Sequence, residues 1–210
     1  MPDSFQQPSL PPAGSGSFDF TAPPRMLFGP GCRAQLPALV ASLGSRPLLV
    51  TGRSDRSAPG FRPAHVERVP GEPTLDLVRE GLQAAREARC DVVVAIGGGS
   101  ALDAGKAVAM LLANGGDPLD YAEVIGANRP IVHPSVPFVA VPTTAGTGSE
   151  ATRNAVLAAR EHGVKVSLRS PLMVARVALV DPELAVELPP ALTAATGLDA
   201  LAQLIEPFLS

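Results

Sequence analysis

The stretch DVVVAIGGGSALDAGK at residues 91–106 decides the fold of this chain. Its β-branched run, bounded by glycines, predicts a strand buried on both faces, as in parallel sheets. The three glycines at 97–99 allow a sharp turn and leave no Cβ between the backbone and a ligand. Ser100 and Asp103 have capping-box spacing, which predicts a helix that begins there and ends at Asn114.

A strand, a glycine turn and a helix N-terminus together favour an anion. Free backbone N–H groups and the positive end of the helix dipole face whatever lies over the turn. The stretch therefore predicts a phosphate or pyrophosphate site; the alternative is a glycine-rich turn that packs tightly and binds nothing. It is not the GxGxxG fingerprint, and it is not a P-loop, because the spacing to Lys106 fits no GxxxxGK(S/T) pattern.

Composition narrows the class of protein. The 210 residues, 46% hydrophobic, are enough for one domain, or one domain plus a piece. A net charge of −3 without a basic block argues against a nucleic-acid partner. Cys32 and Cys90 lie far apart, without metal-ligand spacing, which favours free thiols in a reducing compartment. No apolar run has transmembrane length and no signal pattern opens the chain, so we expect a cytoplasmic protein without a membrane partner.

Strand and helix patterns alternate from residue 27 to 142, which predicts an α/β fold: a parallel sheet with flanking helices. Residues 1–21 are rich in Pro, Ser, Gln and Gly and predict a disordered tail. The expected strands are 47–51, 66–69, 91–97, 138–141 and 177–182, with a hairpin formed by 155–157 and 165–168. The expected helices are 34–43, 74–89, 100–114, 191–196 and 198–208. Residues 55–65 predict a loop or a clipped helix, and a loop follows the central helix through Pro130 and Pro134.

A second polar stretch, PTTAGTGSE at 142–150, follows a predicted buried strand. It concentrates four hydroxyls and two glycines where ligands of open α/β sheets bind, at the carboxyl end of a strand. Hydroxyls donate to phosphate and ribose oxygens without a counter-charge. An ordinary polar loop is the alternative.

These residues carry a resemblance to a known family. The GGGS turn with Asp103 and Lys106, the PTTAGTGSE loop, DPEL at 181–184 and TGLDAL at 196–201 resemble the iron-containing (group III) alcohol dehydrogenases, which include lactaldehyde reductases, butanol dehydrogenases and maleylacetate reductases. The resemblance implies a Rossmann-like dinucleotide-binding domain over 22–188 and, at 189–210, the incomplete start of an all-helical domain, a dehydroquinate synthase-like architecture. It also implies NAD(P) and a divalent metal, Fe²⁺ or Zn²⁺, in the cleft between the domains.

The resemblance assigns the cofactor contacts by position. Gly98, Gly99 and Ser100 would hold the pyrophosphate, and the four hydroxyls would line the adenine, phosphate and nicotinamide sides. The four hydroxyls are those of Thr143, Thr144, Thr147 and Ser149. Thr152 and Lys165 would contact ribose hydroxyls, and Leu184 would lie near the adenine. For Lys165 the alternative is an exposed hairpin lysine.

Gly52 bears on the choice of nucleotide. Family members that use NAD often carry a carboxylate at this strand end, where it accepts from the ribose 2′-OH and repels a 2′-phosphate. Here glycine is followed by Arg53 and Arg56, which predicts that NADP is at least tolerated. Solvent-exposed turn arginines are the alternative.

Asp199 and Gln203 are spaced i, i+4 and share a helix face. The resemblance makes them the first two of four metal ligands, but the family has histidine where this chain has Gln203, and a glutamine carbonyl is the weaker ligand. The family's other two histidines would lie beyond residue 210, and His65, His133 and His162 match no ligand position. The alternative is an ordinary polar helix face.

Three functions follow as hypotheses. The first is an NAD(P)- and metal-dependent alcohol dehydrogenase or aldehyde reductase present as a truncated chain, with a small alcohol or aldehyde as substrate and poor turnover by itself. The second is an inactive nucleotide-binding module or partner subunit. The third is a glycerol dehydrogenase- or dehydroquinate synthase-type enzyme, which the threonine-rich loop fits less well. Unpaired apolar residues on the last helices favour a homo-oligomer.

Overall fold

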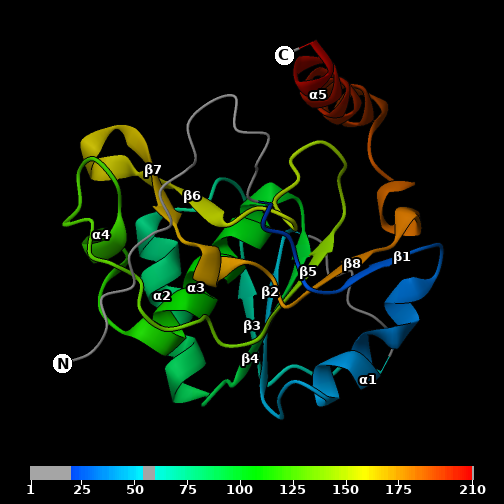
Figure 1. Cartoon of the computed structure of the whole chain (residues 1–210). Coiled ribbons are helices and arrows are strands. Elements are labelled where there is room, and N and C mark those ends of the chain that lie inside the picture. The colour runs from blue at the N-terminus through cyan, green and yellow to red at the C-terminus, as the bar shows by residue number, and fades with distance from the viewer. Residues whose placement is uncertain (1–19, 54–59, 210) are drawn as a thin grey trace.

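Six parallel strands form the sheet at the centre of the molecule (Figure 1). The computed structural model describes residues 20–53 and 60–209. The sheet order is β1-β8-β5-β4-β2-β3, and β6 and β7 form a separate antiparallel hairpin. The bounds are β1 Met26–Phe28, β2 Pro47–Thr51, β3 His65–Arg68, β4 Val92–Gly97, β5 Phe138–Pro142, β6 Asn154–Ala159, β7 Val164–Arg169 and β8 Val177–Val180. The predicted parallel α/β sheet is confirmed.

The central strands alternate their side chains between two hydrophobic clusters. Leu48 and Val50 of β2 face one cluster, and Leu49 between them faces the other. Every residue of β2, β4 and β5 is buried, as a strand covered on both faces requires. One cluster includes residues of α2 (Leu75–Glu87), α3 (Gly99–Asn114) and the hairpin, and the other includes residues of α1 (Leu36–Ala41).

The central helix α3 lies very close to the sheet because Gly105 has no side chain. A Cβ at this position would lie 2.8 Å from the Cβ of Ala95 and 3.1 Å from Cε2 of Phe138. Such a separation is far below van der Waals contact, so no larger residue fits without movement of the helix. Only Gly98 separates the end of β4 from the start of α3, so the helix N-terminus lies at the carboxyl end of the strand.

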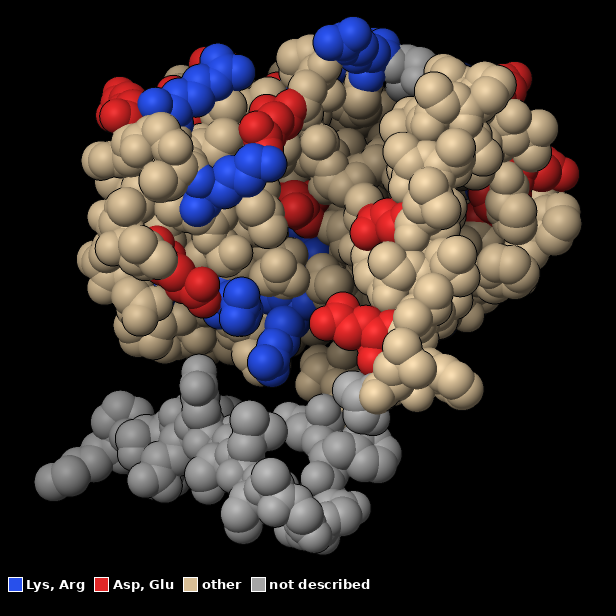
Figure 2. Space-filling model, turned by 90° about the horizontal axis from the view of Figure 1, so that it is seen from above, with Lys and Arg blue, Asp and Glu red and all other residues tan. Residues whose placement is uncertain are grey.

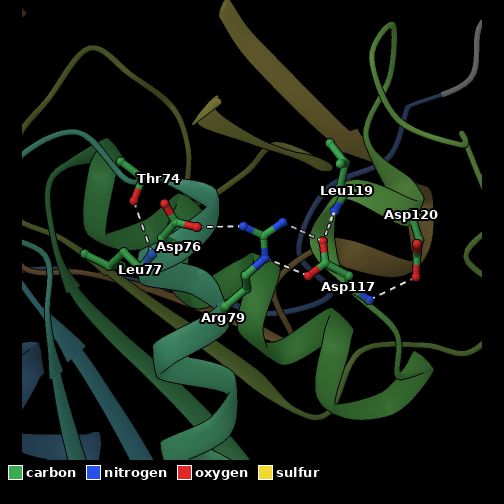
Figure 3. A network of polar contacts seen from close by, with 7 residues as sticks. All are labelled: Thr74, Asp76, Leu77, Arg79, Asp117, Leu119 and Asp120. Carbon is green, nitrogen blue, oxygen red and sulfur yellow. Dashed lines mark hydrogen bonds and ion pairs between the residues drawn. The ribbon is translucent and has the colours of Figure 1, made fainter. Parts of the chain in front are cut away.

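A polar network joins α2 to the short helix α4 (Pro118–Tyr121) (Figure 3). Arg79 donates to both carboxylate oxygens of Asp117, at 2.6 and 2.9 Å, and to Asp76 at 2.6 Å. The pKa of Asp117 is lowered, chiefly by the hydrogen bond from Arg79. Asp117 also caps α4, and Thr74 caps α2 through the amide of Leu77. The network fixes the outer helical layer to the segment that follows α3.

Four sequence-based expectations need correction. The capping box of Ser100 and Asp103 is wrong, because Gly98 is the N-cap of α3 and Asp103 is bonded elsewhere. The loop expected after α3 contains α4, which Asp117 caps. The two expected final helices form one helix, α5 (Pro190–Leu209), because a glycine inside a helix weakens it without ending it. His65, expected in a loop, begins β3.

Other expectations concern regions that are only partly described. The connection from β2 to β3 contains no helix at residues 52, 53 and 60–64, while residues 54–59 lie outside the described residues. The predicted tail also lies outside them, except for residues 20 and 21. Cys32 and Cys90 are free thiols, as expected, and burial raises the pKa of each.

Short 3₁₀ helices connect the remaining elements: η1 (Cys32–Gln35), η2 (Arg160–His162), η3 (Pro171–Met173) and η4 (Pro182–Ala185). Asp181, 2% exposed at the end of β8, accepts from the backbone N–H groups of Gly31, Arg33 and Glu183. One buried carboxylate thus ties the turn after β1 to the start of η4. None of the twenty residues of α5 is buried, and the helix stands apart from the layered body (Figure 1).

Candidate functional site

Two glycines lie side by side where the strand order reverses. The chain runs outward from β2 to β3, returns to β4 beside β2, and then continues outward on the other side through β5. Gly52 follows β2 and Gly97 ends β4, and a Cβ on Gly97 would lie 3.7 Å from the Gly52 nitrogen. Ligands of open α/β sheets bind in the crevice at such a switch point.

The glycine turn and the threonine-rich loop meet at this crevice. A Cβ on Gly98 would lie 3.3 Å from Oγ1 of Thr144, and a Cβ on Gly99 would lie 3.3 Å from Cγ2 of Thr147. The Thr143 amide donates to the Gly97 carbonyl at 2.9 Å, which holds the start of the loop beside β4. The structure therefore brings together the two stretches that the sequence analysis singled out, and side chains on the turn would fill the space between them.

The loop hydroxyls differ in orientation. Ser149 is 5% exposed and its hydroxyl donates to Asp103, and Thr152 accepts from the Lys106 ammonium at 3.1 Å. These two hydroxyls are bonded to the first turns of α3. Thr144 is partly exposed and Thr147 is exposed, and both lie against the glycine turn. Only the second pair lies against the turn itself.

Beneath the loop, α3 carries a buried lysine beside a partly buried aspartate. Lys106 is completely buried, and its Nζ lies 3.9 Å from Oδ1 of Asp103. Burial lowers the pKa of Lys106 to about 8, against the opposing charges of Asp103 and Glu150. Burial also raises the pKa of Asp103, while the hydrogen bond from Ser149 and the charge of Lys106 counteract the increase. The low-polarity surroundings thus disfavour the charged form of both groups.

Three other predicted contacts have partners within the chain. Lys165 on β7 is exposed and forms an ion pair with Glu72 in the connection before α2. Leu184 is 5% exposed and belongs to the cluster that includes α1. The Arg53 Nε donates to the Pro70 carbonyl at 2.7 Å, and Arg56 lies outside the described residues. Ser100, in the first turn of α3, is partly exposed.

Asp199 and Gln203 lie next to each other on α5, as their spacing predicts. The Gln203 amide nitrogen donates to Oδ1 of Asp199 at 3.0 Å and to the Gly146 carbonyl at 2.7 Å. Gly146 has a φ of +98°, and a Cβ there would lie 2.5 Å from the Thr196 carbonyl oxygen, so only glycine permits this approach. Figure 2 shows the molecule from above, with a hollow beside a ridge that carries few charged side chains.

The residues present do not make up a metal site. Asp199 and Gln203 offer two oxygen donors, whereas catalytic zinc sites use three protein ligands. Within residues 20–53 and 60–209 no group of three or more His, Cys, Asp or Glu side chains is arranged to hold an ion. All three histidines are among these residues and lie outside α5.

Lys106 and Asp181 form buried polar contacts that were not predicted from the sequence. Lys106 stands in the otherwise apolar helical run from Ala104 to Leu111, and one turn separates it from Asp103. A charged residue on a buried helix face needs a partner, and this was the available signal. For Asp181 the sequence shows only the local contact to Glu183, because its other two partners, Gly31 and Arg33, are about 150 residues away.

The sequence matches the family model of iron-containing alcohol dehydrogenases over residues 23–182. The 4-hydroxybutyrate dehydrogenase of Cupriavidus necator is 40% identical over 174 residues, which cover 83% of this chain and 45% of the relative. The NAD-dependent methanol dehydrogenase of Bacillus methanolicus is 35% identical over 205 residues, or 91% of this chain and 53% of the relative.

Solved structures agree with this assignment. The sulfoacetaldehyde reductase of Bifidobacterium kashiwanohense in complex with NAD⁺ superimposes with a TM-score of 0.80 at 32% identity, covering 91% of this chain and 53% of that one. An alcohol dehydrogenase from Oenococcus oeni gives a TM-score of 0.80 at 31% identity, covering 90% and 52%. The chain belongs to the iron-containing alcohol dehydrogenase family, and it spans about half the length of these relatives. In the part of the chain that the structure describes, no helix is long and apolar enough to cross a membrane.

Proposed function

We propose that this chain binds a nicotinamide dinucleotide at the crevice between β2 and β4, and that its activity is hydride transfer between the nicotinamide and a small alcohol or aldehyde. The observation that carries the proposal is the pair of glycines at the switch point, continued by the Gly98–Gly99 turn. Family membership supplies the reaction class, since the relatives named above are dehydrogenases and reductases of small molecules.

The chain's own residues would act by binding and orienting the nucleotide. The first backbone N–H groups of α3 have no acceptor within the helix and would donate to the pyrophosphate, with Ser100 beside them. Thr144 and Thr147 face the same space and would donate their hydroxyl protons. Thr143, Ser149 and Thr152 would shape the inner wall.

Two further contacts belong to the same proposal. Lys165 would reach a ribose hydroxyl after exchanging its exposed ion pair with Glu72, which is a weak interaction at 64% side-chain exposure. Leu184 would support the adenine side through the cluster into which it packs. When bound, the nicotinamide supplies the hydride chemistry.

We propose that NADP is accepted beside NAD. Gly52 presents no carboxylate to a 2′-phosphate, and a Cβ at this position would meet nothing within 4 Å. Arg53 would offer a guanidinium by leaving the Pro70 carbonyl, with which it now forms one exposed hydrogen bond. Glycine removes the repulsion, and arginine favours the phosphate.

Asp199 and Gln203 are proposed as two oxygen ligands toward a divalent ion, Fe²⁺ or Zn²⁺, that other groups would have to complete. The second candidate function is a nucleotide-binding module without turnover. The Gln203 contacts favour it, because this side chain is bonded to Asp199 and Gly146.

We also propose a homo-oligomer. Met26 and Phe28 on the edge strand β1 are 54% and 77% exposed, and α5 exposes a row of large apolar side chains. Exposed apolar surface of this kind marks association sites.

The test combines binding with turnover on the 210-residue chain. NADPH oxidation is followed with short aldehydes, and NAD⁺ reduction with 4-hydroxybutyrate and methanol, each with added Fe²⁺ or Zn²⁺ and with a chelator as control. Metal-dependent turnover would support the dehydrogenase. Saturable nucleotide binding without turnover would favour the second candidate, and the absence of binding to either nucleotide would refute both.

A further inference from the structure

Lys106 is a fully buried ammonium group on a helix face that is otherwise apolar. Its Nζ donates to the Ser149 carbonyl at 2.8 Å, the Thr152 hydroxyl at 3.1 Å and the Asn154 carbonyl at 2.8 Å. A lysine ammonium has three N–H donors, so these three acceptors use all of them. Burying a charge is expensive unless it is paired and hydrogen-bonded, and this site meets both conditions.

Asp103, one turn earlier on α3, binds the same stretch of chain. It accepts from the Ser149 hydroxyl and, at 3.1 Å, from the Val156 amide. Residues 149–156 thus have contacts to two charged side chains of a single helix. We call Asp103 and Lys106 the α3 clamp.

The clamp connects the two halves of the proposed nucleotide site. α3 begins at the glycine turn, and residues 149–156 lead from the threonine-rich loop into the hairpin strand β6. Because one helix carries both the turn and the clamp, the distance between Gly99 and Thr147 depends on where the clamp holds the end of the loop. The loop contains Gly146 and Gly148, both with positive φ, and these glycines leave it conformationally free in the absence of an anchor.

We propose that Lys106 is a positioning residue for nucleotide binding: it holds residues 149–154 so that Thr144 and Thr147 stay against the glycine turn. Lys106 itself is buried beneath the loop and touches no ligand. This role rests on the proposed function, and it goes further by making affinity depend on a residue outside the binding surface.

The experiment compares Lys106→Met with Val108→Ala. Methionine has a similar length and removes all three donors, whereas Val108 is 1% exposed on the same helix and faces Gly81 of α2 instead of the loop. Affinity for NADPH and NADH is measured by fluorescence, and thermal unfolding checks the fold. Amide hydrogen exchange of residues 143–156 is followed without nucleotide.

For folded Lys106→Met we expect about tenfold weaker nucleotide binding and faster exchange across 143–156, while exchange in the central sheet is unchanged. Val108→Ala should lower the melting temperature without either effect. Lys106→Gln, which keeps two N–H donors, should lie between wild type and methionine. That ordering would not follow from a packing defect alone.

Several results would overturn the role of Lys106. Wild-type nucleotide affinity in a folded Lys106→Met variant would refute the positioning role and leave the proposed function standing. An equal loss of nucleotide affinity in Val108→Ala would do the same. If neither Lys106 variant folds, the residue serves the fold and the positioning role is wrong. If the wild-type chain binds neither nucleotide, the proposed function fails and this role fails with it.

Discussion

The crevice at the carboxyl ends of β2 and β4 is held by many contacts within the chain, whereas the helix α5 has few. At the crevice, the glycine turn, the threonine-rich loop and the hairpin are joined through α3 by buried contacts of Asp103 and Lys106. Among the described residues, no buried side-chain nitrogen or oxygen lacks a hydrogen-bond partner. By contrast, α5 has no buried residue, and the contacts described above join it to the loop at Gly146.

The difference concerns which part of the function each region can support. A binding surface needs backbone and hydroxyl groups held in fixed positions, and the sheet edge has the packing to hold them. A metal site needs at least three ligands in fixed geometry, and α5 offers two, on an exposed helix. We therefore expect nucleotide binding to depend on the crevice between β2 and β4 and to be insensitive to substitutions along most of α5.

The largest contrast should come from one substitution made in the central sheet and in α5. Phe138 on β5 is 1% exposed and Phe208 on α5 is 86% exposed. Phe138→Ala should lower the free energy of unfolding by about 3–5 kcal/mol, because it removes a buried ring and leaves a cavity. Phe208→Ala should change it by less than about 0.5 kcal/mol. Urea unfolding measures both, and similar losses would mean that α5 is packed in solution.

Substitution of the glycine turn should affect binding more than folding. Gly99→Val would place a side chain within 3.3 Å of Thr147 and into the space between turn and loop. We expect about tenfold weaker binding of NADPH and NADH, with a stability loss of about 1 kcal/mol from overpacking. Gly197→Ala on α5 is the control, since a Cβ there meets nothing within 4 Å. Unchanged affinity in Gly99→Val would place the nucleotide elsewhere.

The buried ammonium predicts a pH effect on stability. The pKa of Lys106 is lowered from 10.5 to about 8, so above pH 8 the unfolded chain binds more protons than the folded one. The contribution of Lys106 to the free energy of unfolding should therefore rise as pH increases from about 8 to 10. The negative charges of Asp103 and Glu150 oppose the lowering of the Lys106 pKa, and burial outweighs them. Urea unfolding of wild type and Lys106→Met should show a rise confined to wild type; an equal slope in both would contradict the burial argument.

A smaller effect tests the choice of nucleotide. An aspartate side chain has room at position 52, at the end of β2, and Gly52→Asp would introduce a carboxylate beside Gly97. Repulsion between two exposed charged groups should weaken NADPH binding on the order of fivefold relative to NADH. The ratio of the two dissociation constants measures this directly and cancels general damage to the site. A ratio equal to that of wild type would show that residue 52 does not face the 2′ position.

The smallest effect is expected on α5. Gln203→His would replace an amide by an imidazole four residues from Asp199, giving two good ligands on one face. Calorimetric titration with Zn²⁺ should show weak binding in the variant and still weaker binding in wild type. Tight binding by the wild-type chain would mean that the two donors present are completed by other groups.

Much of the fold was predictable because its signals are local. The buried run 92–97, the glycine turn and the alternation of strands and helices predicted the parallel sheet, and the hairpin was predicted from its two short strands. The helix boundaries were less predictable. Asp103 has the spacing of a capping residue, but its partners Ser149 and Val156 are about fifty residues away and outcompete the local contact.

The candidate site was predictable in part. The sequence indicated both the glycine turn and the threonine-rich loop, and strand order then brings them together. It did not separate Ser149 and Thr152, bonded to the α3 clamp, from Thr144 and Thr147, which face the turn. That distinction depends on the depth of each side chain below the surface, and a run of similar hydroxyl residues carries no information about it.

The most direct test of the account is a fluorescence titration of the wild-type chain with NADPH and NADH in the presence of a chelator. If the crevice between β2 and β4 binds nucleotide without a metal, both nucleotides should bind saturably at one per chain in the presence of the chelator. Binding that appears only when Fe²⁺ or Zn²⁺ is added, or no binding at all, would contradict the claim that the crevice between β2 and β4 is complete in this chain.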